Sequence, residues 1–146
     1  LDSTSNTFKI ALVQLEAGSV ATTFDARSFG TELASCQRYF SKSYDHDVAP
    51  GTASTVVGSV AIRNGPVTAD NTPFWHCAFP VAMRDNPTVT TFDYGGTSGK
   101  IVGPSAASVT GTTYQQGTSG FNVANSSGSS VSSGEYYCNW QAVSEL

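Results

Sequence analysis

The stretch that decides the fold is residues 12–40, LVQLEAGSVATTFDARSFGTELASCQRYF. Up to Leu15 the chain alternates as a β-strand does, and Gly18 with Ser19 supplies a turn. Beyond the turn the period changes, because apolar side chains recur at spacings of three and four residues; they are Phe29, Leu33, Cys36 and Phe40. This spacing predicts one short amphipathic helix over residues 29–38, and the rest of the chain reads as β-structure.

The predicted helix carries its own start signals. The hydroxyl of Ser28 or of Thr31 can accept a hydrogen bond from a free N–H group of the first turn. The carboxylate of Glu32 complements the positive end of the helix dipole. We therefore expect an N-terminal arm over residues 1–27, which links to an upstream region, and one domain over residues 28–146.

The arm is apolar on both faces of its expected strand. One face holds Phe8, Ile10 and Leu12, and the other holds Ala11, Val13 and Leu15. A strand of this kind needs cover on both sides. A neighbouring subunit, an upstream domain or the chain's own fold could supply that cover, and periodicity does not distinguish among them.

Short alternating segments with turn residues between them fill the rest of the chain. The predicted strands are residues 38–44, 54–63, 74–84, 87–94, 100–102, 107–114, 120–124 and 135–143. Turn signals such as Pro50-Gly51 and Gly95-Gly96 separate them. This pattern predicts a mainly β protein, an antiparallel β-sandwich of the jelly-roll kind, with the one short helix and the arm.

Composition narrows the class of protein. With 146 residues and 39% hydrophobic content, the chain can form one domain with a real core. Only 12% of residues are charged, against about a quarter in typical domains, so hydroxyl and amide groups dominate the polar surface and suit hydrogen bonding to sugars. The net charge of −4 with seven scattered basic residues argues against nucleic acid. The sequence holds no apolar run long enough to insert in a membrane.

Three cysteines, Cys36, Cys77 and Cys138, are an odd number and sit among apolar neighbours. They cannot form a closed disulfide framework within one chain. We interpret them as small buried thiols, with one disulfide and a spare thiol as the alternative. Free thiols fit a protein that folds in a reducing compartment.

Catalytic motifs are missing from the sequence. His46 and His76 are the two histidines, and neither lies in a recognisable catalytic setting. The sequence contains no nucleophile elbow, Walker loop, H-E-x-x-H or paired C-x-x-C. Asp45, His46 and Asp47 could ligate a metal, but a solvated loop is the better interpretation. We expect no enzyme activity, no metal site and no cofactor.

Binding of a sugar needs an aromatic face together with amide or carboxylate groups. The candidate ligand-binding residues are Tyr94, Asp93, Tyr114, Gln116 and Trp140, with Gln115 and Asn139 as further candidates. Large aromatic side chains mostly serve packing, so a place in the core is the preferred alternative for Trp140 and Trp75. Tyr94 and Tyr114 are better candidates because they lie next to predicted loops.

Three blocks of the sequence resemble segments found in bacteriophage tail fibres and tailspikes. VQLEAGSVATTFDAR and TELASCQRYF, at residues 13–27 and 31–40, are similar to their Q-L-E-x-G-S-x-A-T-x-F-E and E-L-x-x-C-Q-R-Y-[YF] elements. FPVAMRDNPTVTTFDYGG, at residues 79–96, resembles their F-P-V-x-M-R-x-x-P-T-V-T stretch, and WQAVSEL at residues 140–146 resembles their ending. The chain departs from the pattern at Thr23, at Asp25 and at Val143-Ser144.

The resemblance implies a C-terminal receptor-binding region at the tip of a virion tail fibre, assembled in the bacterial cytoplasm. Such a region would bind a bacterial surface glycan, either capsule or lipopolysaccharide, and would form a homotrimer joined to upstream fibre domains. The resemblance supplies no residue-level site. Two alternatives stay open: a purely structural trimerisation cap, and a carbohydrate-binding module attached to a glycan-degrading enzyme or a glycan-cleaving domain in its own right.

Overall fold

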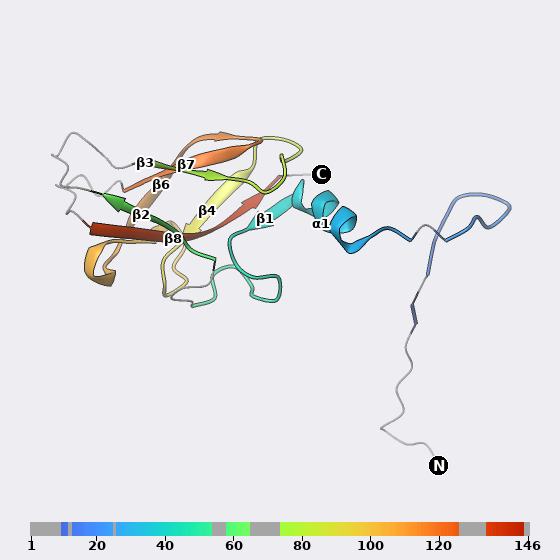
Figure 1. Cartoon of the computed structure of the whole chain (residues 1–146), viewed down its shortest axis with the longest axis horizontal. Coiled ribbons are helices and arrows are strands. Elements are labelled where there is room, and N and C mark those ends of the chain that lie inside the picture. Colours follow the sequence, from blue (N-terminus) through green and yellow to red (C-terminus); the bar gives the residue numbers. More distant parts are fainter. Residues whose placement is uncertain are drawn as a thin grey trace, which may run out of the picture.

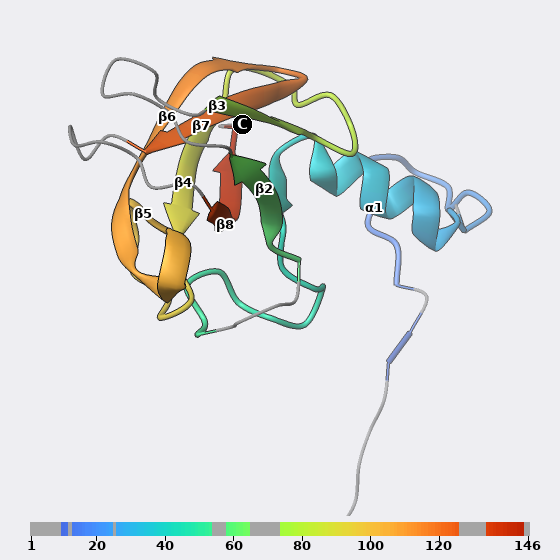
Figure 2. The same cartoon turned by 60° about the vertical axis from the view of Figure 1, so that its left-hand side comes forward.

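The computed structural model describes residues 10–11, 13–24, 26–53, 58–64, 74–125 and 134–144. Within these residues the chain is mainly β, with eight antiparallel strands in one sheet that curls into a half-barrel, and one short α-helix (Figures 1 and 2). The elements are α1 (Phe29–Gln37), β1 (Phe40–Lys42), β2 (Val60–Asn64), β3 (Phe74–Ala78), β4 (Thr88–Phe92), β5 (Lys100–Val102), the 3₁₀ turn η1 (Pro104–Ala106), β6 (Ser108–Gly117), β7 (Gly120–Asn125) and β8 (Gly134–Val143). The prediction of a mainly β chain with a single short helix is confirmed for this part of the chain.

The last strand, β8, lies at the centre of the pairing. Along the sheet the order is β1-β8-β5-β6-β7-β3, and β2 and β4 also pair with β8. Because β8 is ten residues long, different parts of it hold different partners. Its second half pairs with β4 and β1, and its first half pairs with β2 and, at one residue, with β5.

The curl depends on the long strand β6. Its first residues pair with β5, and its remaining residues pair with β7. The hydrogen-bonded ladder therefore runs without a break from the β8 half of the sheet to the β7–β3 half. The sequence predicted a two-sheet sandwich, whereas the structure has one sheet whose two halves face each other across the core.

Aromatic side chains join the two halves. Phe79 follows β3, Phe121 lies on β7, and Trp140 comes from β8 on the opposite half. The ring centroids of Phe79 and Trp140 are 5.5 Å apart, and those of Phe121 and Trp140 are 5.4 Å apart. Trp75 and Tyr136 make a second cross-core contact at 6.4 Å. This cluster positions β8 and the loops at its ends.

The helix forms as its sequence indicates, but it packs little. Ser28 is the N-cap and accepts a hydrogen bond from the Thr31 N–H at 3.3 Å, and Glu32 lies in the first turn. All nine residues of α1 are described, and none of them is buried. Phe29 is 74% exposed and Leu33 is half-buried, so the described residues cover the predicted apolar stripe only in part.

The predicted strand up to Leu15 does not form in the described residues of the arm. Residues 10–11, 13–24 and 26–28 contain neither helix nor strand, because no neighbouring strand supplies hydrogen-bond partners for an extended segment. Ile10, Val13 and Leu15 are 69%, 74% and 99% exposed. The arm runs away from the curled sheet (Figure 1).

The cysteines divide into two kinds. Cys77 and Cys138 are buried free thiols, and Cys36 is an exposed free thiol on α1. The prediction of buried thiols is therefore confirmed for two cysteines and wrong for Cys36. The reason is that the face of α1 to which Cys36 belongs is not covered.

Candidate functional site

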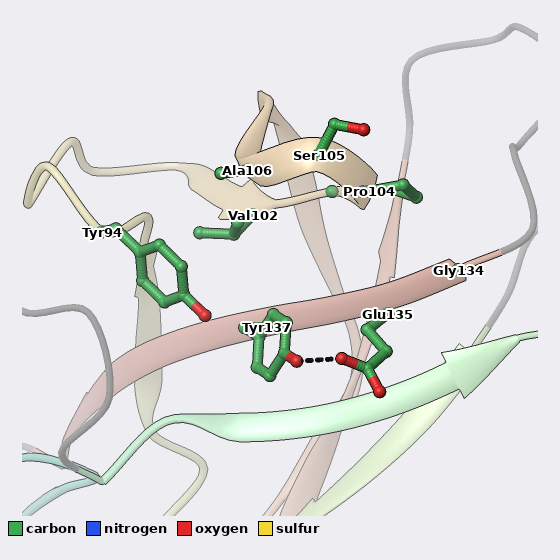
Figure 3. Close-up of a pocket in the computed structure, with 9 residues that line it drawn as sticks. Tyr94, Val102, Pro104, Ser105, Ala106, Gly134, Glu135 and Tyr137 are labelled. Atoms are coloured by element: carbon green, nitrogen blue, oxygen red, sulfur yellow. Dashed lines mark hydrogen bonds between the residues drawn. The ribbon is translucent and has the colours of Figure 1, made fainter.

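A hollow of about 270 Å³ opens beside the start of β8. Its wall consists of Tyr94, Val102, Gly103, Pro104, Ser105, Ala106, Gly134, Glu135 and Tyr137 (Figure 3). Three segments far apart in the sequence contribute to it: the turn after β4, the η1 turn after β5, and the first residues of β8. The hollow therefore exists only because strand pairing brings these three segments together.

Two tyrosine rings that line the hollow pack against each other. The pairing of β4 with β8 ends at Phe92 opposite Asn139, and Val102 of β5 is the residue paired with Tyr137. Tyr94 reaches the Tyr137 ring from the turn that follows β4. The two ring centroids are 5.7 Å apart, with 38° between the ring planes. Together the rings form an apolar surface; the Tyr94 hydroxyl is directed towards Tyr137, and the Tyr137 hydroxyl is directed towards Glu135 (Figure 3).

A carboxylate lies beside these rings. The Tyr137 hydroxyl donates a hydrogen bond to Glu135 Oε2, two residues earlier on the same face of β8 (Figure 3). Burial, and secondarily the negative charge of Glu135, raise the pKa of Tyr94. The Tyr94 hydroxyl therefore stays protonated at neutral pH and can donate as well as accept hydrogen bonds.

The η1 turn forms the remaining wall of the hollow, and its backbone conformation is unusual. Ser105 and Ala106 both have a φ of 59°, in the left-handed region, which costs free energy in residues other than glycine. Gly134 has a φ of 154°, and a Cβ atom built there would lie 2.8 Å from Pro104 Cγ. The turn thus packs closely on the start of β8. The Ser105 side chain points away from the two tyrosines (Figure 3).

Asp93, a candidate ligand-binding residue, is only 5% exposed and holds its own turn together. Its Oδ1 accepts from the Thr97 N–H at 2.8 Å, and its Oδ2 accepts from the Ser108 hydroxyl at 2.5 Å. Burial by itself would raise the pKa of Asp93, but the hydrogen bonds from Ser108 and Thr97 outweigh it and hold the pKa below the ordinary value. Asp93 is a positioning residue for the turn that carries Tyr94.

Trp140, another candidate, lies in the core. It is 4% exposed and packs between Phe79 and Phe121. The indole ring therefore presents no face to a ligand, and we do not include it in the site. Asn139 is buried as well, at 1% exposure.

Tyr114 and Gln116 lie near the C-terminal end of β6, whereas the hollow lies near its N-terminal end. Tyr114 is 40% exposed, and Gln116 Nε2 donates to the Thr113 hydroxyl at 2.7 Å. The predicted residues therefore lie in different places: Tyr94 lines the hollow, Asp93 is buried in the turn before it, Trp140 lies in the core, and Tyr114 and Gln116 lie on β6. Of the five, Tyr94 is the one that lines the hollow.

The sequence reasoning missed Glu135 and Tyr137. The sequence did indicate that the two lie side by side, because residues two apart on a strand share a face, and Glu135 and Tyr137 are two apart on the predicted strand. Nothing in the sequence linked that pair to Tyr94, which lies 43 positions earlier than Tyr137 by residue number.

A second hollow of about 270 Å³ lies between α1 and β1, lined by Leu33, Cys36, Gln37, Phe40, Ser41, Lys42, Tyr44 and His46. Lys42 Nζ turns to the backbone, donating to the carbonyl oxygens of His46 and Val48 at 3.1 and 2.6 Å. The ring of His46 lies 6.2 Å from that of Phe29.

The described residues offer neither a metal-ligating cluster nor a membrane-spanning helix. Within them, no three side chains of His, Cys, Asp or Glu gather in a way that could hold a metal ion, and Asp45, His46 and Asp47 fall in that part of the chain. No described helix has both the length and the apolar character needed to cross a bilayer.

Comparisons of the chain with protein-family models, with curated proteins and with solved structures find no match.

Proposed function

We propose that the chain is a receptor-binding domain from the C-terminal region of a bacteriophage tail fibre or tailspike, which binds a host surface polysaccharide without cleaving it. The observation that carries this proposal is the hollow lined by the contacting rings of Tyr94 and Tyr137 and by Glu135. The three sequence blocks similar to tail fibres point to the same function.

The chemistry of the hollow suits a sugar ring. The C–H face of a pyranose can pack on a tyrosine ring, while its hydroxyl groups bond to phenol and carboxylate oxygens. A volume of about 270 Å³ lies just below the range of roughly 300–1,000 Å³ that holds drug-sized ligands. The size therefore favours a single sugar residue of a longer chain.

One small open site of this kind would bind weakly, so firm attachment requires several copies. In the proposed homotrimer three linked sites act together, and the effective concentration of the second and third sites raises the overall affinity.

Exposed apolar side chains on the arm and on α1, such as Leu15, Val20 and Phe29, support contacts between subunits or with upstream fibre domains. A jelly-roll relationship belongs to the same proposal, because the two facing halves of the curled sheet resemble the two sheets of a jelly roll.

A purely structural trimerisation cap is the second candidate, and the same exposed apolar side chains favour it. A cap would assemble but would bind no glycan. A glycan-cleaving domain has less support, because glycoside hydrolysis generally uses two carboxyl groups, and Glu135 is the acidic residue among those that line the hollow.

The test is adsorption of the purified chain to host cells and to their isolated polysaccharide, with two variants at one position. Tyr94→Ala removes the ring and should weaken binding at least about tenfold, whereas Tyr94→Phe keeps the stacking face and should lose no more than about threefold. Thermal unfolding checks that both variants fold. Assembled protein that binds no polysaccharide would favour the cap, and release of reducing ends would favour the enzyme.

A further inference from the structure

We propose that the outer face of β6, β7 and β3 is a second glycan subsite, separate from the hollow, that selects an N-acetylated amino sugar. The residues of this acetamido subsite are Tyr114, Gln115, Asn122 and His76. The proposal rests on the proposed glycan-binding function and adds to it a ligand class and a second place of binding.

Strand register brings three of these side chains into one row, and Gln115 joins it through a hydrogen bond from Asn122. Tyr114 of β6 pairs with Asn122 of β7, and Asn122 pairs with His76 of β3. Residues directly opposite each other in antiparallel strands project from the same face. The alternate residues Trp75, Cys77, Phe121 and Val123 are buried, so the row lies on the face away from the core, where His76 is exposed.

Hydrogen bonds determine which atoms of the row donate and which accept. Asn122 Nδ2 donates to Gln115 Oε1 at 2.6 Å, so the Asn122 oxygen is the acceptor that faces His76 Nδ1 at 3.0 Å. His76 Nδ1 must then carry the hydrogen, which leaves Nε2 of the neutral ring as an acceptor. Gln115, whose oxygen accepts, keeps its NH₂ group as a donor.

The backbone holds the row in place. Gln115 has a φ of 47° and sits in the irregular part of the β6–β7 pairing. The His76 ring packs over Gly120, where a Cβ atom would lie 2.7 Å from Cε1 and 2.8 Å from Nε2. A ligand therefore meets groups that are already ordered, so binding costs little additional side-chain entropy.

An acetamido group matches this arrangement. Its carbonyl oxygen can accept from the Gln115 NH₂ group, and its N–H can donate to His76 Nε2. The Tyr114 ring, next to Gln115 on β6, offers an apolar surface to the methyl group or to the sugar ring. A plain hexose lacks the paired carbonyl and N–H, and we expect it to bind more weakly for that reason.

The test is isothermal titration of the full chain with triacetylchitotriose, and with cellotriose as the matched sugar that has the same linkage but no acetamido groups. The wild type should bind the acetylated trimer about tenfold more tightly. Gln115→Glu replaces the NH₂ donor and His76→Ala removes the acceptor, and each should weaken binding by about three- to tenfold per lost hydrogen bond. Gln116→Ala, an exposed neighbour that bonds to Thr113, is the control and should bind as the wild type does.

A second measurement needs no variant. Side-chain amide NMR signals of Gln115 and Asn122 should shift when triacetylchitotriose is added to the wild type, and those of Gln116 should not. Equal binding of the two sugars, or unchanged binding in both row variants, would overturn the acetamido subsite. If host polysaccharide still binds in a Tyr94-dependent way, the proposed function stands without the subsite. If no glycan binds at all, both fail.

Discussion

The curled sheet buries its large apolar side chains, whereas the described N-terminal segment exposes them. The sheet encloses Phe121, Ile101 and Val123 completely, each at 0% exposure. Of the nine exposed large apolar side chains in the described part of the chain, six lie in residues 10–37; they are Ile10, Val13, Leu15, Val20, Phe24 and Phe29. An apolar pattern becomes a core only where another segment pairs with it or packs over it. The sheet has such segments, and the described residues of the N-terminal segment are not covered by any.

The largest effect should come from the core of the sheet. Trp140→Ala removes the indole that contacts Phe79 and Phe121, and we expect it to lower the free energy of unfolding by about 3–5 kcal/mol. Trp140→Phe is the matched control. It should cost clearly less, because the Trp140 N–H has no hydrogen-bond partner among the described residues. Urea unfolding measures both, and equal losses would show that ring packing is not the main contribution.

The next effect concerns the turn that carries Tyr94. Asp93→Asn weakens the hydrogen bonds from Ser108 and Thr97, and a loss of about 1–3 kcal/mol at pH 7 is expected. Because the folded-state pKa of Asp93 is lowered, its stabilising effect is present above the ordinary pKa of about 3.9 and is lost as pH falls through the lower folded value. Unfolding measured from pH 7 to pH 2 should show a shallower decline in Asp93→Asn. Identical profiles would contradict this role.

Thiol reactivity should separate the same two regions without any mutation. In the native protein we expect one thiol per chain to react quickly with iodoacetamide, that of Cys36 on α1. A hydrogen bond with Cys77, together with burial, raises the pKa of Cys138 well above its usual value, so this thiol stays protonated and unreactive. Mass spectrometry of intact protein should show three modified thiols only after denaturation. Rapid native labelling of all three would mean that the sheet opens readily.

The smallest effect on stability should come from the N-terminal segment. Leu15→Ser and Phe29→Ser change side chains that are 99% and 74% exposed, so the free energy of unfolding of the sheet should stay within about 0.5 kcal/mol of the wild type. The same pair should lower the mass of the proposed homotrimer in sedimentation, since it removes apolar contact area. Val20→Thr removes less apolar area than these two changes, so it should lower the mass in sedimentation less. A wild type that sediments as a stable particle of 15.2 kDa would show that the segment needs no second copy.

Local patterns in the sequence were sufficient for the helix and for most strands. Ser28 and the spacing from Phe29 predicted a helix over residues 29–38, and α1 spans Phe29–Gln37. The strand predicted over residues 74–84 is shorter, because β3 ends at Ala78, ahead of Pro80, which has no N–H to donate to a ladder. The strand predicted in the arm did not form in its described residues, since an extended segment depends on a partner that its own sequence does not specify.

The sequence by itself determined the period of each segment, and hence which residues share a face. It placed Glu135 and Tyr137 together, and it placed Trp75 and Cys77 on the face opposite to His76. Only the tertiary structure decided which faces are covered and which distant residues meet. Tyr94 reaches Tyr137 because the turn after β4 lies beside the part of β8 that pairs with β5. Periodicity acts within a few residues, whereas burial and register depend on hydrogen bonds and contacts between strands far apart in the chain.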